Sequence, residues 1–182
     1  MRIGFLASLS LAVISVCCGE TPSLRLDGGG SLSYAVQDGK TVFSIRSAST
    51  KATRVAVQRD ASVAANSAPD SVKLIAEMPK SFLVVVDSYP SIPGSMSFCQ
   101  AGEESFLRVL NVAAKRPAET YRTKVESCRS NVELASPGIQ WSKDERTVTI
   151  HWLSAPGSLG KPQTLSLKIH GEGKTTETKT EQ

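Results

Sequence analysis

Apolar and polar residues alternate over short stretches of this chain, which is typical of half-buried β-strands. The clearest case is residues 31–46, SLSYAVQDGKTVFSIR. Asp38-Gly39 fits the two-residue turn of a tight hairpin, because both positions of that turn need positive φ. Counting outward from the turn pairs four apolar side chains on one face of the predicted hairpin: Leu32 with Ile45, and Tyr34 with Phe43.

Further stretches of the same kind follow at short intervals. Residues 82–87 contain FLVVV, which is continuously apolar and predicts a strand covered on both faces. Residues 146–153 and 163–170 predict a final hairpin with Trp152 in the core and opposite Leu165. The other predicted strands are residues 54–59, 72–77, 105–112, 121–128 and 131–134. About ten short strands predict an all-β fold, either an antiparallel sandwich or a small barrel.

Both ends of the chain are predicted to lie outside this domain. Residues 1–18 begin with Met1-Arg2 and continue with the apolar run IGFLASLSLAVISV. That run is too short for a spanning helix and has the pattern of a Sec-type secretory signal peptide. Residues 171–182, GEGKTTETKTEQ, contain no apolar residue and are predicted to be disordered. We therefore expect one β-rich domain over residues 19–170, located in the periplasm or anchored to the envelope.

A pair of cysteines at the end of the leader leaves two kinds of processing open. The stretch that ends in Val16-Cys17 is similar to the motif of bacterial lipoproteins, although Val16 is bulkier than that motif requires. Lipidation of Cys17 or Cys18 would anchor the chain to a membrane. Ordinary cleavage after Cys18 or Gly19 would instead remove both cysteines with the leader.

The mature chain keeps two cysteines, Cys99 and Cys128. An even pair in an exported chain predicts one disulfide. In the chain-entropy model, such a cross-link stabilises the folded state by roughly 3–4 kcal/mol.

Composition and the placement of histidines argue against nucleic-acid binding and metal binding. The chain has 182 residues, of which 40% are hydrophobic and 21% charged, so it can form a packed core. Its net charge of +4 is scattered along the sequence, and we expect no nucleic-acid partner. His151 and His170 are predicted on the polar faces of the final hairpin, too far apart to share a metal ion. No metal or other cofactor is expected.

The stretch from Phe98, FCQAGEESFLRVL, joins a cysteine, a glycine turn and two adjacent glutamates to an apolar strand. Neighbouring residues of an extended chain point to opposite faces, so Glu103 and Glu104 do not converge on one substrate. We expect a solvated turn that a Cys99–Cys128 disulfide pins in place. No nucleophile–base set is visible, so the chain is not expected to be an enzyme.

Exposed loops on a rigid scaffold are good places for binding residues. Residues 89–94 contain two prolines and are predicted to form such a loop. Trp141 follows a Pro-Gly turn and either contacts a partner or packs beneath that turn. The candidate partner-binding residues are Ser88, Tyr89, Ser91, Ile92, Gln100, Glu103, Glu104 and Trp141.

The pattern C-x-A-G-x-E from Cys99 to Glu104, with Ser127-Cys128 downstream in an exported β-domain, loosely resembles bacterial periplasmic inhibitor and immunity proteins. Those proteins block lysozymes or toxic cell-wall hydrolases. The resemblance spans residues 95–153 and implies a protein that binds and inhibits a toxin or hydrolase. No family binding residue is carried over, because the Ser-Gly and Tyr signature of lysozyme inhibitors is not found here. The alternatives are a structural or assembly lipoprotein of the envelope and a secreted enzyme.

Overall fold

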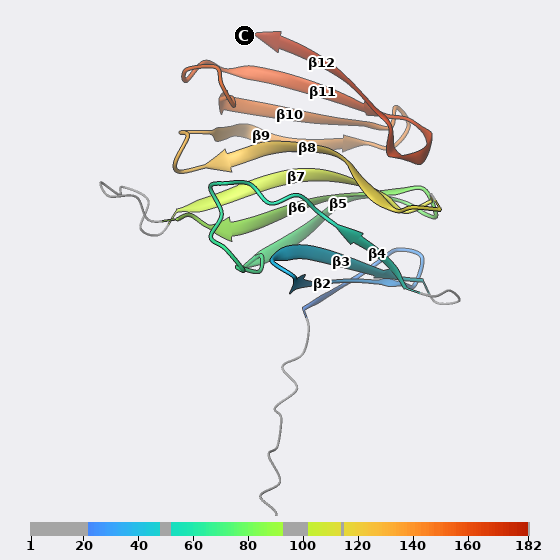
Figure 1. Ribbon diagram of the computed structural model, residues 1–182. Coiled ribbons are helices and arrows are strands. Elements are labelled where there is room, and N and C mark those ends of the chain that lie inside the picture. Colours follow the sequence, from blue (N-terminus) through green and yellow to red (C-terminus); the bar gives the residue numbers. More distant parts are fainter. Residues whose placement is uncertain (1–21, 48–51, 93–101, 114, 182) are drawn as a thin grey trace, which may run out of the picture.

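The structure, a computed structural model, describes residues 22–47, 52–92, 102–113 and 115–181. Within these residues it is all-β, with three antiparallel four-stranded sheets and one 3-10 turn at Gly171–Gly173 (Figure 1). Strands that are neighbours in each sheet are also neighbours in the sequence, so each sheet is a meander. The predicted all-β class is confirmed, and the architecture is a sandwich.

Each sheet occupies one continuous part of the chain. The first sheet has the order β1 (Ser23–Arg25), β2 (Ser31–Gln37), β3 (Lys40–Arg46) and β4 (Thr53–Ala56). The second has the order β5 (Ser71–Met78), β6 (Phe82–Pro90), β7 (Glu103–Asn111) and β8 (Ala118–Ser127). The third has the order β12 (Thr175–Glu181), β11 (Gln163–Ile169), β10 (Thr147–Ser154) and β9 (Glu133–Ser142).

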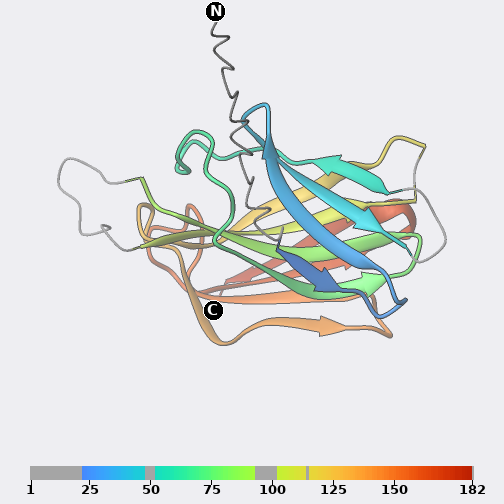
Figure 2. The same ribbon diagram turned by 90° about the horizontal axis from the view of Figure 1, so that it is seen from below.

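The second sheet is the middle layer, and both of its faces are covered. Its Val84 and Val109 pack with Ile150 and other apolar residues of the third sheet. On the opposite face, Leu83 and Val85 pack with apolar residues of the first sheet, Leu32, Phe43 and Val55. Figure 2 shows the first sheet, in blue and cyan, lying across the green strands of the second. The continuous apolar run of β6 follows from this position, because successive side chains enter different cores.

The hairpin of β2 and β3 is confirmed in both turn and register. Asp38 has φ 50° and Gly39 has φ 72°, as a two-residue turn of this type requires. Tyr34 pairs with Phe43, and Leu32 pairs with Ile45.

The final hairpin is confirmed, but its predicted register is wrong. Trp152 pairs with Gln163, and Leu165 pairs with Ile150, so the strands are shifted by two residues from the prediction. A shift of two keeps every side chain on its original face. The alternation of apolar residues therefore does not distinguish the two registers. Trp152 is buried as expected, and its indole N–H donates to the carbonyl oxygen of Val125.

The predicted disorder of residues 171–182 is wrong for most of that segment. β12 pairs with β11 along its whole length, from Thr175 opposite Ile169 to Glu181 opposite Gln163. An edge strand has a partner on one side only and need not bury an apolar face. The polarity of TTETKTE therefore indicates an edge strand.

Several predictions fall on parts of the chain that the structure does not describe. They concern the signal segment at residues 1–18 with Cys17 and Cys18, and also Cys99 and Gln100. The signal peptide, the lipidation and the Cys99–Cys128 disulfide therefore stay predictions. Among the described residues, no helix has the length and hydropathy needed to cross a membrane.

Candidate functional site: a buried ionic network and a pinned corner

The predicted binding residues do not share one environment. Four of them, Ser88, Tyr89, Ser91 and Glu104, are buried, so the expectation that their side chains are exposed in loops is wrong, and their contact with a partner stays a prediction. Ile92 and Trp141 are half-buried, and Glu103 is exposed. Trp141 packs edge-on against Phe82, with ring centroids 6.2 Å apart, which fits the packing alternative.

The prediction of a loop at residues 89–94 is wrong for Tyr89 and Pro90, and residues 93 and 94 lie outside the described part of the chain. Tyr89 and Pro90 continue β6 and pair with Glu104 and Glu103 of β7. Pro90 is the last residue of its strand, where the missing N–H of proline is tolerated. The N–H of Ser91 then donates to the carbonyl oxygen of Gly102 at 2.9 Å.

Arg108 is the centre of an ionic network between the first and second sheets. Its side chain is 1% exposed, and its Nε lies 2.7 and 2.8 Å from the two carboxylate oxygens of Asp87. Its Nη1 lies 2.6 Å from Oε1 of Glu119. Burial opposes the charge of Arg108, but Asp87 and Glu119 outweigh it and raise the pKa of the guanidinium.

A tyrosine extends this network to the first sheet. The hydroxyl of Tyr89 donates to Asp87 Oδ2 at 2.7 Å and lies 2.9 Å from Oγ1 of Thr41 on β3. Burial raises the pKa of Tyr89, and the neighbouring Asp87 carboxylate adds to that effect. The phenol therefore stays protonated and bridges the two layers.

The same charges explain why β4 ends at Ala56 rather than at the predicted residue 59. Arg108 donates to the carbonyl oxygen of Gln58 at 2.8 Å, and the N–H of Gln58 donates to Glu119 at 2.8 Å. Two side chains of the second sheet thus satisfy the backbone of Gln58 in place of a strand partner. The chain leaves the first sheet and crosses towards β8.

Phe106 lies among three cations next to this crossing. The guanidinium carbons of Arg108 and Arg122 are 5.3 and 5.9 Å from its ring centroid, and Lys124 Nζ is 5.5 Å away. These distances allow cation–π attraction. Asp60 balances the charge, with Lys124 at 3.6 Å and Arg122 at 4.0 Å.

Glu104 is fully buried and connects several segments at the end of the second sheet. Its carboxylate accepts hydrogen bonds from the hydroxyl of Ser127 at 2.7 Å and from the hydroxyl of Ser91 at 2.9 Å. The N–H of Arg129 and the ammonium of Lys124 donate to it at 3.2 Å each. Burial alone would raise the pKa of Glu104, but the hydrogen bonds from Ser127, from the backbone of Arg129 and from Ser91 hold that pKa below its ordinary value.

The turn before Glu104 is packed closely against β8. A Cβ atom at Gly102 would lie 2.5 Å from Cβ of Cys128, so only glycine fits there. The N–H of Cys128 donates to the carbonyl oxygen of Glu103 at 3.3 Å. The predicted solvated turn is therefore right for Glu103 and wrong for Glu104. We call this region, residues 91–92, 102–104 and 127–133, the pinned corner.

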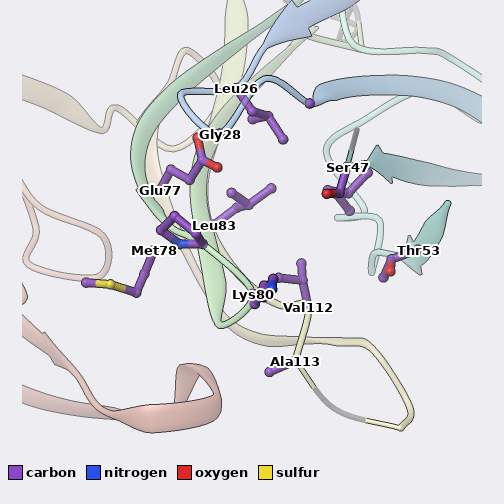
Figure 3. A pocket seen from close by; sticks show the side chains of 13 residues that line it. Leu26, Gly28, Ser47, Thr53, Glu77, Met78, Lys80, Leu83, Val112 and Ala113 are labelled. Carbon is purple, nitrogen blue, oxygen red and sulfur yellow. The ribbon is translucent and has the colours of Figure 1, made fainter. Parts of the chain in front are cut away.

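A cavity of about 310 Å³ lies at the opposite end of the sandwich, between the first and second sheets. Figure 3 shows Leu26 and Leu83 pointing into it, with Glu77 and Lys80 among the residues around it. Glu77 is engaged in the structure, because its Oε2 accepts a hydrogen bond from the N–H of Asp27 at 2.7 Å.

The polar groups of the network serve mainly to fix the layers. In the described part of the chain, every buried side-chain nitrogen or oxygen has a hydrogen-bond partner. No group of three histidine, cysteine, aspartate or glutamate residues suited to a metal ion occurs among these residues. His151 and His170 contact Thr164 and Thr176 at 3.1 and 3.0 Å, outside the network.

Sequence reasoning missed the network, although one signal for it is present. Arg108 stands in the middle of an apolar strand, and Asp87 ends the run FLVVVD. Since a strand covered on both faces has no solvent for a charge, opposite charges on two such strands predict a buried pair. Glu119 and Lys124 carry no comparable signal, because their strand is mostly polar.

Comparison of the chain with protein-family models, curated proteins and solved structures finds no match.

Proposed function

We propose that this chain is an exported, non-enzymatic protein that binds and inhibits another protein, a toxin or a cell-wall hydrolase of the envelope. The pinned corner is the proposed contact surface. The observation that supports it is the buried carboxylate of Glu104, which ties Ser91, Ser127 and the backbone of Arg129 together beneath an exposed edge.

A corner fixed in this way favours binding because little conformational entropy remains to be lost. At the same end of the sheet, on the face of β7 opposite to Glu104, the side chains of Glu103, Glu126 and Glu133 are exposed around a shallow hollow of about 290 Å³. Although the whole chain has a net charge of +4, this surface favours a basic patch on the partner. Such attraction acts mainly on the association rate and weakens with salt.

Location in the periplasm is part of the same proposal. The leader at residues 1–18 supports export, and the Cys99–Cys128 pair fits an oxidising compartment. Soluble and lipid-anchored forms are both compatible with a binding surface at the pinned corner, since that corner belongs to the folded domain.

The test is the digestion of purified peptidoglycan by lysozyme-type muramidases and by the host's own cell-wall hydrolases. We expect the exported chain to inhibit at least one of these enzymes at a one-to-one ratio. The double variant Glu103→Lys/Glu133→Lys should inhibit it at least roughly tenfold less well, because two attractive charges become repulsive. Its thermal midpoint should stay unchanged, because both side chains are exposed.

A matched control is available on the opposite end of the third sheet. Asp144→Lys/Glu145→Lys makes the same change of net charge at two exposed positions between β9 and β10. This variant should inhibit as the wild type does. An equal loss of inhibition in both double variants would show that net charge alone is responsible and would count against the pinned corner as the contact surface.

A further inference from the structure

The loop between β10 and β11, residues 155–162, presents a leucine to solvent. The side chain of Leu159 is 99% exposed. Among the described residues, the other exposed large apolar side chain is that of Leu153, at 51%. Single exposed leucines are common on protein surfaces, so exposure alone does not assign a role to Leu159.

The backbone of Leu159 is unusual for its residue type. Its φ of 55° lies in the left-handed region, which leucine seldom occupies. Gly157 and Gly160 on either side also have positive φ, 73° and 84°. Glycine or asparagine would fit the position of Leu159 with less strain, and strained residues of this kind gather at functional sites.

The loop is also closed by its own hydrogen bonds. Oγ of Ser158 lies 2.8 Å from the carbonyl oxygens of Ala155 and of Lys161. It accepts from the N–H of each of those two residues at 3.1 Å. The N–H of Ala155 donates to the carbonyl oxygen of Lys161 at 3.2 Å, which closes the base of the loop. Leu159 is thus held out on a preorganised turn.

The position of the loop connects it with the pinned corner. Ser154, the residue before the loop, pairs with Glu133 in the third sheet, and its hydroxyl donates to the carbonyl oxygen of Asn131. Figure 1 shows the turn between β10 and β11 at the same end of the molecule as the start of β7 and the end of β8. The apolar tip and the acidic hollow therefore border one end surface.

We propose that Leu159 is an apolar anchor that enters a pocket on the protein bound by the pinned corner. The inference deepens the proposed function and rests on it. It requires a partner surface with a basic patch beside an apolar pocket that accepts one isobutyl group. Anchors of this type contribute most to affinity when neighbouring contacts exclude water around them.

Two other binding partners of Leu159, a membrane and a second copy of the chain, fit the observations less well. A membrane would bury only one isobutyl group, which is fewer carbons than a single acyl chain that itself binds marginally. A second copy could receive Leu159 in the cavity of about 310 Å³, but that cavity lies at the opposite end of the sandwich. Such a contact would be head-to-tail and would produce closed rings or open filaments rather than a simple dimer.

The test uses the exported chain, a panel of purified lysozyme-type muramidases and two matched leucine variants. Leu159→Ala shortens the isobutyl side chain to a methyl group and keeps the left-handed backbone, whereas Leu153→Ala makes the same change at the other exposed leucine, on β10. We expect Leu159→Ala to weaken inhibition roughly 30-fold and Leu153→Ala to change it less than about twofold. Both variants should keep the thermal midpoint of the wild type.

The outcomes separate this inference from the proposed function. Undiminished inhibition by Leu159→Ala, with loss in Glu103→Lys/Glu133→Lys, would overturn the anchor and leave the pinned corner standing. A wild-type chain that inhibits no enzyme of the panel would contradict both. Binding to anionic vesicles, or self-association in sedimentation, that disappears in Leu159→Ala would assign the leucine to a membrane or to a second copy and overturn the proposal.

Leu159→Gly provides a readout that does not depend on the partner. Glycine relieves the strain of the left-handed backbone, so its thermal midpoint should lie about 2 °C or more above that of Leu159→Ala. A midpoint equal to or below that of Leu159→Ala would show that a residue with a Cβ atom fits this backbone without strain, and the strain would no longer support an anchor at Leu159.

Discussion

Replacement of Glu104 by glutamine tests how the pinned corner is held. The carboxylate accepts hydrogen bonds from two hydroxyls, one backbone N–H and the Lys124 ammonium, and it is 0% exposed. Glutamine keeps one acceptor oxygen and places an NH₂ group where the other oxygen accepted. Because a lost hydrogen bond to a charged group costs about 1.5–3 kcal/mol, we expect Glu104→Gln to lower the free energy of unfolding by about 2–4 kcal/mol.

Urea unfolding gives this difference as a shift of the midpoint at unchanged m-value. Amide hydrogen exchange should show where the loss occurs, with faster exchange at Arg129, Ser130 and Ser91. The control is Glu103→Gln, which changes an exposed carboxylate next in the sequence and should cost less than about 0.5 kcal/mol. Equal and small effects of both substitutions would refute the idea that Glu104 holds the corner together.

The difference in free energy of unfolding between the wild type and Glu104→Gln should depend on pH with a definite sign. Hydrogen bonds hold the pKa of Glu104 below its ordinary value in the folded protein. The stability that its ionised form contributes is therefore complete above the pKa of the unfolded chain, about 4.3, and is lost as the pH falls through the lower folded value. The gap in free energy of unfolding between the wild type and Glu104→Gln should be constant near neutral pH and shrink below about pH 4. A gap that widens with acid would contradict the direction of the pKa shift.

Three further substitutions, two of them with a matched control, test the packing of the layers and of the pinned corner. Arg108→Met leaves the buried Asp87 without its cation and should lower the free energy of unfolding, measured in urea, by about 3–5 kcal/mol. Its control, Arg122→Met, changes a partly exposed side chain and should lower that free energy by about 1 kcal/mol or less. Gly102→Ala brings a Cβ to 2.5 Å from that of Cys128 and should lower the free energy of unfolding, measured by thermal unfolding, by about 1–3 kcal/mol. Its control, Gly28→Ala, has its nearest neighbouring atom at 3.7 Å and should lower that free energy by less than about 1 kcal/mol. Tyr89→Phe removes the donor to Asp87 and should cost about 1–3 kcal/mol, and a neutral result would show that the bridge to Thr41 is dispensable.

The hairpin around Asp38-Gly39 and the central strand at residues 82–87 could be predicted from the sequence, because local signals determine both. The turn residues fix the register of the hairpin, and a run without polar positions requires cover on both faces. The register of the last hairpin could not be predicted in this way. Its loop is eight residues long and closed by Ser158, and alternation permits any even shift.

The exposure of Glu103 and the burial of Glu104 show why the site was harder to predict than the strands. Alternation correctly places these two carboxylates on opposite faces of β7. Which face is covered depends on where residues 57–63 cross over β8, and that crossing is set by contacts of Gln58 with Arg108 and Glu119. These contacts join residues 50 and 61 positions apart, beyond the reach of any local pattern. The same long-range packing buries Tyr89 and Ser91, which the two prolines of their segment had suggested were exposed.

The most direct test of the account is amide hydrogen exchange of the exported chain with and without a hydrolase that it inhibits. The proposal predicts added protection at residues 102–103, 127–133 and 155–162, at one end of the sandwich. It predicts no change around the cavity at the other end, at Gly28, Lys80 and Val112. Protection confined to the cavity end, or spread evenly over the outer faces of the sheets, would contradict the pinned corner as the binding surface.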